Sequence, residues 1–297
     1  MSFPIGSHSL RACVQGVGLG VFFVLLLVSV AFAAVSLRLF RSAWEARGAE
    51  GWLGLAFLCV ALSMPLRFLI QRSQLIPDDL APTFLLGGHA LMALGLSAFT
   101  LFVARVFRPD SGWAAVVTGA LIGIQVLSLP ALVLFGGHRD EQSIAVMAVG
   151  LCRALPFAWG LFESIRYHRL MQRREALGLA DAVVTNRFAL FAVWTGALVG
   201  LPILLFFVRS WVLLSTETGK MLGADGALSA PGQVLAAGLL VFGLSAAVAL
   251  WLSFFPPQFW LDRVRVRARR HEAIAKTASA RSAGRAAVPR SRARPLR

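Results

Sequence analysis

The chain has 297 residues and a formal net charge of +15, yet only 14% of its residues are charged and 58% are hydrophobic. A soluble globular domain carries roughly 25% charged residues. The composition therefore excludes a water-soluble globular fold. It predicts an all-α, polytopic membrane helix bundle, because a hydrocarbon layer offers unpaired backbone groups no hydrogen-bond partner.

Long uncharged stretches predict where helices cross the membrane, since about 18 or more such residues span a hydrocarbon core ~30 Å thick. Five stretches are uninterrupted: 12–37, 80–104, 111–138, 188–208 and 226–261. Two more contain charges: 51–70 includes Arg67, and 143–165 includes Arg153 and Glu163. We expect about seven transmembrane helices within a domain at 1–257, with six or eight as the alternatives.

Basic residues orient the chain, because arginine and lysine collect in cytoplasmic loops. The segments after the first, third and fifth spans, together with the end of the chain from 262, carry 22 of them, and the opposite side carries 5. This predicts an inner-membrane protein with its N-terminus outside and its C-terminus in the cytoplasm. Cleavage after Ala31-Phe32-Ala33 is the rival interpretation, but it would invert every later loop. Six tryptophans fall near predicted cytoplasmic ends, as interfacial anchors do: Trp52, Trp113, Trp159, Trp194, Trp251 and Trp260.

The segment 258–297 is predicted to be a basic, largely disordered cytoplasmic tail. A short interfacial helix is expected at 258–275, and the remainder is too poor in apolar residues to fold. We expect the tail to bind anionic lipids of the bilayer, and not nucleic acid, because no aromatic residues alternate with its arginines. At this length it holds no output domain, so any signal is expected to pass to a separate partner protein.

The chain contains three short internal matches in the same order: 36–41 with 164–169, Pro65 with Pro202, and 95–98 with 243–246. They predict that spans one to three repeat as five to seven around a linking fourth, a 3+1+3 parallel repeat. Coincidence is the alternative, since apolar helices use few residue types. A true repeat would place a binding site near the axis between its halves.

Arg153 is the first candidate ligand-binding residue, because an ionisable group at mid-depth costs ~2.5 to 3.5 kcal/mol on insertion scales and is functional by default. Gln125, Ser97 and Ser245 fall at similar depths and could line a polar pocket with it. A guanidinium offers five donors and no acceptor, so the pocket would favour an anionic or carbonyl-bearing ligand. The alternative is that Arg153 bonds backbone carbonyls and only fixes helix packing.

Two further ionisable groups lie within predicted spans. His89 is a candidate ligand-binding residue at about the depth of Arg67, and its ordinary role would be to donate a hydrogen bond between helices. A single histidine provides no metal or haem site, since these need more ligands. Glu163 precedes Arg166 by three residues, which predicts a local interfacial ion pair.

No catalytic motif, metal site or cofactor site is predicted. Walker loops, Gly-x-Gly-x-x-Gly and His-Glu-x-x-His are absent from the sequence. The only lysines, Lys220 and Lys276, lie outside the spans, which excludes bound retinal. Cys13, Cys59 and Cys152 form no Cys-x-x-Cys and are interpreted as packing residues.

Two segments carry a family resemblance: Arg-Val-Phe-Arg-Pro-Asp at 105–110, and Phe-Phe-Pro-Pro at 254–257 before a basic stretch. With the helix order, they resemble the membrane half of bacterial seven-helix sensory proteins. The resemblance implies a receptor-like or accessory protein that binds a small or lipidic ligand in its bundle and signals through a separate partner. The chain departs from that family in lacking an output domain. A small-solute transporter of 3+1+3 architecture is the alternative, and a scaffold ranks after it.

Overall fold

The computed structural model describes residues 26, 29–44, 48–72, 80–135, 144–214 and 230–266. These residues form eight helices and no strand, so the predicted all-helical fold is confirmed for the part described. The helices are a segment at 29–44, α2 (Glu50–Arg72), α3 (Ala81–Phe107), α4 (Gly112–Leu134), α5 (Ile144–Ala176), α6 (Ala182–Leu214), α7 (Ala230–Phe254) and a short helix at 258–266.

Five of these helices, α3 to α7, are long and apolar enough to cross a membrane by length and composition. α2 contributes a shorter apolar stretch, Glu50–Ser63, and most of the first expected span lies outside the described residues. The chain is thus a membrane protein by this measure. Seven spans, the inner membrane and the orientation of the termini stay predictions.

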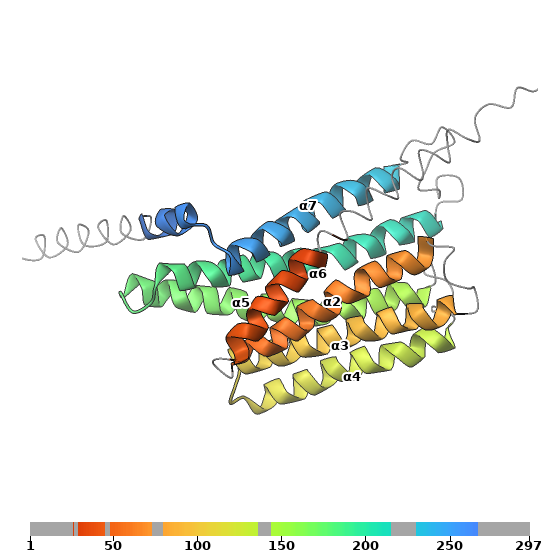
Figure 1. Cartoon of the computed structure of the whole chain (residues 1–297), viewed down its shortest axis with the longest axis horizontal. Helices are drawn as coiled ribbons and strands as arrows, with labels where there is room; N and C mark the ends of the chain where they lie inside the picture. Colours follow the sequence, from red (N-terminus) through yellow and green to blue (C-terminus); the bar gives the residue numbers. More distant parts are fainter. Residues whose placement is uncertain are drawn as a thin grey trace, which may run out of the picture.

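Neighbouring helices run antiparallel along the long axis of the molecule (Figure 1). The pairs α5/α6, α2/α3 and α6/α7 pack most extensively, while α4 lies against α3 and α5. The turns after α3 and α5, the start of α2 and the helix at 258–266 all lie at one end, here called the tail-side end. The opposite end is called the distal end.

An aromatic core links four helices on the tail side of mid-bundle. The ring of Trp194 on α6 lies 5.4 Å from Phe57 on α2, 5.7 Å from Phe99 on α3 and 6.1 Å from Phe157 on α5. Trp194 is almost fully buried and Trp159 is buried as well. The interpretation of these two tryptophans as interfacial anchors is wrong, because both pack inside the protein, whereas Trp251 is half-exposed.

The two copies of the Gly-Leu-Ser-Ala match have different environments. Leu96 on α3 is 1% exposed, whereas its counterpart Leu244 on α7 is 60% exposed. A Cβ on Gly95 would come within 2.9 Å of Cys59 and 3.1 Å of the Ala56 carbonyl, whereas one on Gly243 would meet nothing within 4 Å. Gly95 therefore permits close approach of α2 and α3, a role that its counterpart does not share. The repeat stays a prediction.

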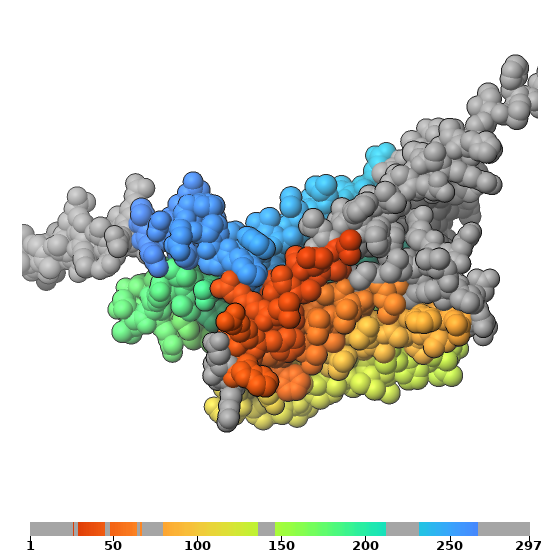
Figure 2. Space-filling view, in the orientation of Figure 1, coloured from red at the N-terminus to blue at the C-terminus, as the bar shows by residue number. Residues whose placement is uncertain are grey.

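The helices α5 and α6 are longer than the other helices and extend beyond the rest of the bundle. Each has 33 residues, which is about 50 Å at 1.5 Å per residue, against a hydrocarbon core of ~30 Å. Figure 1 and Figure 2 show their joined ends projecting from the tail-side end. We call residues 166–187 the α5–α6 hairpin.

Local capping makes the turn of this hairpin well defined. Gly178 has φ 71° and donates its N–H to Glu175 O at 2.9 Å, while Leu179 N–H bonds Arg174 O at 2.8 Å. This is a Schellman motif, in which glycine adopts the left-handed conformation without strain. Asp181 then caps α6 by accepting the Val183 N–H at 2.8 Å. The turn leaves two apolar side chains outside: Leu177 and Leu179 are 73% and 75% exposed.

Candidate ligand-binding cavity

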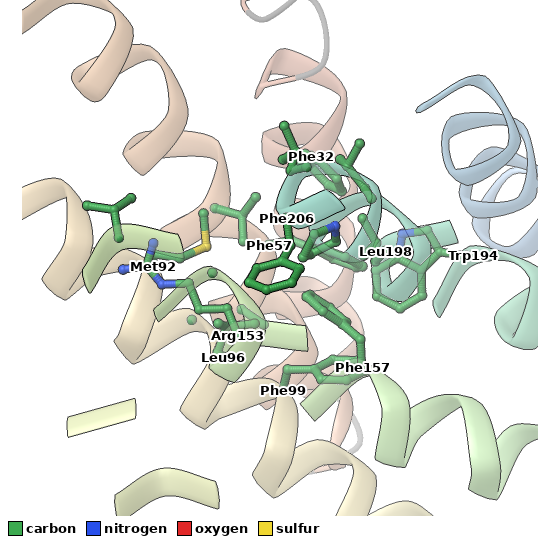
Figure 3. Close-up of a pocket in the computed structure, with 18 of the residues that line it drawn as sticks. Phe32, Phe57, Met92, Leu96, Phe99, Arg153, Phe157, Trp194, Leu198 and Phe206 are labelled. Atoms are coloured by element: carbon green, nitrogen blue, oxygen red, sulfur yellow. The ribbon is translucent and has the colours of Figure 1, made fainter. Parts of the chain in front are cut away.

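A cavity of about 280 Å³ lies between the segment 29–44, α2, α3, α5 and α6. Figure 3 shows aromatic rings gathered around it, with Arg153 entering beside Met92. Its lining consists of Phe32, Ala56, Phe57, Val60, Met92, Gly95, Leu96, Phe99, Val146, Met147, Gly150, Arg153, Phe157, Trp194, Leu198, Leu201, Pro202, Leu205, Phe206 and Arg209. Only two of the twenty are charged, and both are arginine.

Helical periodicity places these residues on one face of each helix. On α5 the lining positions are 146, 147, 150, 153 and 157, and on α6 they are 194, 198, 201, 202, 205, 206 and 209. Steps of three and four residues return to the same side of an α-helix. Gly150 lies within this α5 face, and a Cβ added there would meet no atom within 4 Å. The two faces thus enclose the space together with α2 and α3.

Arg153 and His89 form the central polar contact. Arg153 Nη2 lies 2.6 Å from His89 Nδ1, which joins α5 to α3, and His89 is fully buried. Because a guanidinium has no acceptor, Nδ1 must accept this hydrogen bond and the ring proton must sit on Nε2. The predicted interhelical bond of His89 is confirmed, but at Nδ1 the histidine accepts instead of donating. Its expected neighbour Arg67 has a side chain outside the described residues.

The other predicted ligand-binding residues lie outside the cavity lining. Gln125 is fully buried on α4 and donates Nε2–H to Cys152 O at 3.1 Å, so it contacts the backbone beside Arg153 but not the cavity. Ser97 donates to Ala93 O at 2.8 Å within its own helix. Ser245 lies on α7, which contributes no lining residue. The structure therefore brings Arg153, His89 and Gln125 together and leaves the two serines apart.

Several lining residues were not predicted. The expected span 188–208 ends just before Arg209, but α6 continues to Leu214 and carries Arg209 into the lining. The aromatic members come from five separate helices. Each helix contributes only one or two of these aromatic residues, so the sequence of a single helix does not predict that they cluster. The cluster forms only when the helices pack together. For Arg209, the signal was the apolar sequence that continues on both sides of it.

The tail-side end holds a buried carboxylate. Glu163 on α5 is 0% exposed and accepts from Arg108 Nε at 2.9 Å. Its contact with Arg166 is longer, 3.5 Å, and Arg166 is half-exposed. The expected local ion pair with Arg166 is therefore confirmed, but the closer partner of Glu163 is Arg108. Arg108 lies 55 residues earlier, just after α3, and ties that helix end to α5.

Three arginines also stack on an aromatic ring of another segment at this end. Arg38 lies 4.7 Å from the Phe255 ring centroid, Arg105 lies 5.0 Å from that of Trp52, and Arg108 lies 5.0 Å from that of Trp113. Such contacts are worth ~0.5 to 1 kcal/mol when exposed and more when desolvated. Together with Glu163, two of these arginines connect α2, α3, α4 and α5, and Arg38 connects the segment 29–44 to the chain just after α7. We call this set the arginine clamp.

Within the described ranges, no three His, Cys, Asp or Glu side chains gather closely enough to hold a metal ion. Cys59 and Cys152 are free thiols, the first of them buried among apolar neighbours. No family model matches this chain, and no curated protein or solved structure matches it either. Function therefore has to be inferred from the cavity and from the elements around it.

Proposed function

We propose that this chain is a receptor-like or accessory protein of the inner membrane that binds a small or lipidic ligand in the cavity and signals through a separate partner protein. The cavity itself is the observation that supports this most. Protein interiors are usually tightly packed. A cavity of about 280 Å³ lined by five helical elements is therefore a candidate ligand-binding site. Pockets for small molecules are mostly apolar with a few placed polar groups, which matches this lining.

The size and polarity of the space favour a compact, largely apolar ligand. A cavity of about 150 Å³ holds benzene, so this one is suited to a molecule of roughly twice that size. A hydrophilic solute would need polar groups along a path, and the lining offers two arginines among eighteen apolar residues. Binding of an apolar molecule therefore ranks above transport of a water-soluble one.

The α5–α6 hairpin supports a partner on the tail side. It extends well beyond the bundle, and its turn presents Leu177 and Leu179 to solvent next to Arg173 and Arg174. Exposed apolar side chains on a rigid element are typical of protein contact sites. The proposed partner has an acidic surface with an apolar centre, and lies in the cytoplasm if the basic end faces inward as predicted.

A cavity-filling variant tests ligand binding. In Gly150→Phe, a ring enters the cavity from α5, whereas in Gly119→Phe the same ring is added on the exposed face of α4, where a Cβ also meets nothing within 4 Å. A ligand at 100 times its Kd stabilises by about 2.7 kcal/mol. An extract of total membrane lipids should therefore raise the Tm of the wild type and of Gly119→Phe in detergent.

The same extract should raise the Tm of Gly150→Phe much less. Equal Tm shifts in all three proteins would contradict binding in the cavity. An absence of any shift in the wild type, together with an empty cavity by native mass spectrometry of protein taken directly from membranes, would do so as well.

A further inference from the structure

We propose that the ligand carries a flat, conjugated ring with a carbonyl-type oxygen, and that this oxygen accepts a hydrogen bond from the indole N–H of Trp194. This rests on the proposed function, which concerns only whether a ligand occupies the cavity. The inference adds the chemical class of the ligand and the end of the cavity at which its oxygen binds. One buried donor and the rings around it support it.

Trp194 places a buried hydrogen-bond donor at the wall of the cavity. Its side chain lines the cavity and is only 2% exposed, and its Nε1 has no hydrogen-bond partner among the described residues. A buried N–H without a partner is costly, and the indole N–H of a buried tryptophan usually has one. An acceptor atom on the ligand would satisfy this donor.

The side chains packed around Trp194 offer it no acceptor. The rings of Phe57, Phe99, Phe157 and Phe191 have their centroids 5.0 to 6.1 Å from that of the indole. A phenylalanine ring has no oxygen or nitrogen, and an N–H that points at its face gains only a weak contact. A buried water molecule needs two to four polar partners, and these four rings provide none. A ligand oxygen is therefore the acceptor best suited to this position.

Trp194 lies at the tail-side end of the cavity, away from the two arginines of the lining. Counting from the hairpin turn at Leu179, Arg153 and Leu205 are equally far along the antiparallel pair α5 and α6. Trp194 lies eleven residues before Leu205, about 16 Å towards the tail side, and Figure 3 shows Trp194 and Arg153 on opposite sides of the view. Among the lining residues other than the arginines, Trp194 alone has a side-chain N–H or O–H. It is therefore the side-chain donor for an oxygen at this end.

The aromatic residues of the lining favour a flat ring on the ligand. Aromatic rings gain edge-to-face and offset contacts with one another beyond the burial of area, which a saturated molecule does not. Six lining residues can provide such contacts: Phe32, Phe57, Phe99, Phe157, Trp194 and Phe206. Because a cavity of about 150 Å³ holds benzene, the volume of about 280 Å³ is suited to two fused rings.

Three bicyclic probes that differ in one feature test the inference on the full-length protein in a neutral detergent. Tetralone has a benzene ring fused to and conjugated with a cyclic ketone, tetralin lacks the oxygen, and decalone keeps the oxygen but has no aromatic ring. Equilibrium dialysis measures their affinities, each expressed relative to the probe's partition into empty micelles.

Two substitutions of tryptophan by phenylalanine form a matched pair. Trp194→Phe removes the N–H from the cavity wall and keeps a ring. Trp159→Phe is the control, because Trp159 is also buried and its Nε1 also lacks a partner in the described ranges, but it does not line the cavity.

The preference for tetralone over tetralin should be about fivefold larger in the wild type than in Trp194→Phe, since one net hydrogen bond is worth that much. Trp159→Phe should keep the wild-type preference. Tetralone should bind about threefold more tightly than decalone, because aromatic contacts add to burial.

Nuclear magnetic resonance of the ¹⁵N-labelled indole groups reports the bond directly. Tetralone should move one indole N–H signal of the wild type downfield, and tetralin should not. Trp194→Phe should lack that signal. If this variant loses its monodisperse elution, the wild-type spectra with the two probes test the same bond.

The outcomes separate this inference from the proposed function. The same preference for tetralone in the wild type and in Trp194→Phe, or no downfield signal, would overturn the bond to Trp194 while leaving a ligand cavity in place. Decalone that binds as tightly as tetralone would overturn the flat ring. Failure of all three probes to bind above empty micelles would overturn the inference, whereas the lipid extract and Gly150→Phe decide the proposed function independently.

Discussion

The two ends of the bundle are held together by different means. At the tail-side end, the arginine clamp joins neighbouring helices through a fully buried carboxylate and three arginine–aromatic contacts. Towards the distal end, Arg153 bonds His89 and Gln125 bonds the Cys152 carbonyl. There the helices surround a cavity instead of closing on one another.

This difference suggests a division of labour along α5. The clamp holds the tail-side ends of the helices together, so the distal half is free to adapt to a ligand without loss of the fold. Elements that change on binding are drawn from the less stable parts of a protein. If so, substitutions in the clamp should lower stability most, and substitutions around the cavity should lower it less while changing ligand affinity.

Glu163→Gln should have the largest effect. It removes the only acid that faces Arg108 and Arg166 among the described contacts, and breaking a buried pair costs about 3 kcal/mol. Thermal unfolding in detergent should show a clear fall in Tm. The control is Asp262→Asn, which breaks an exposed pair with Arg265 at 3.9 Å and should cost ~0 to 1 kcal/mol. Equal losses for the two would show that the clamp does not dominate.

His89→Ala should have a moderate effect, about 1 to 2 kcal/mol, because Arg153 loses the acceptor of its interhelical bond. The same variant should also bind the ligand of the membrane-lipid extract more weakly, which would appear as a smaller rise in Tm. His89→Asn keeps a carbonyl acceptor and should recover part of both losses. A loss as large as that of Glu163→Gln would remove the distinction between the two ends.

Gly178→Ala should cost about 1 kcal/mol, since alanine is strained at φ 71° in the hairpin turn. Gly119→Ala on α4 is the matched control and should be neutral or slightly stabilising, because that helical site is open. The Tm values of the two variants provide the measurement. A neutral Gly178→Ala would mean that the hairpin turn is not the rigid element described above.

Gln125→Met should have the smallest effect, within about 0.5 kcal/mol. It loses one bond to Cys152 O but also removes a buried Oε1 that has no partner among the described residues. The affinity for the ligand of the membrane-lipid extract, measured from the rise in Tm, should stay within about twofold of the wild type, because Gln125 does not line the cavity. A larger loss of affinity would return Gln125 to the binding site.

The sequence predicts the helices best where charge or proline borders an apolar stretch. The spans expected at 80–104 and 111–138 correspond to α3 and α4, with ends within a few residues. For α5 and α6 the prediction stopped at the last apolar residue, although both helices continue past it. Hydropathy marks where lipid ends, not where a helix ends. Gly178 and Asp181 are the capping signals that mark the true boundary.

Contacts between distant segments are what the sequence could not predict. The i to i+3 spacing of Glu163 and Arg166 was visible, but the closer partner Arg108 depends on how α3 packs against α5. In the same way, depth alone grouped His89 with Arg67, and only packing pairs it with Arg153. Arg153 itself could be predicted as a site residue, because a charge in a hydrocarbon layer is conspicuous in any sequence.

One helix connects the two halves of the molecule mechanically. α5 carries Arg153 at the cavity, Glu163 in the clamp and Arg173 in the projecting hairpin, all on one 33-residue helix that has Pro156 between the first two. With Glu163 as the pivot, a tilt of the helix that follows ligand entry would swing its far end in the opposite sense. The exposed side chains of Leu177 and Leu179 would then change position when a ligand fills the cavity, and a partner protein bound to them could detect that change.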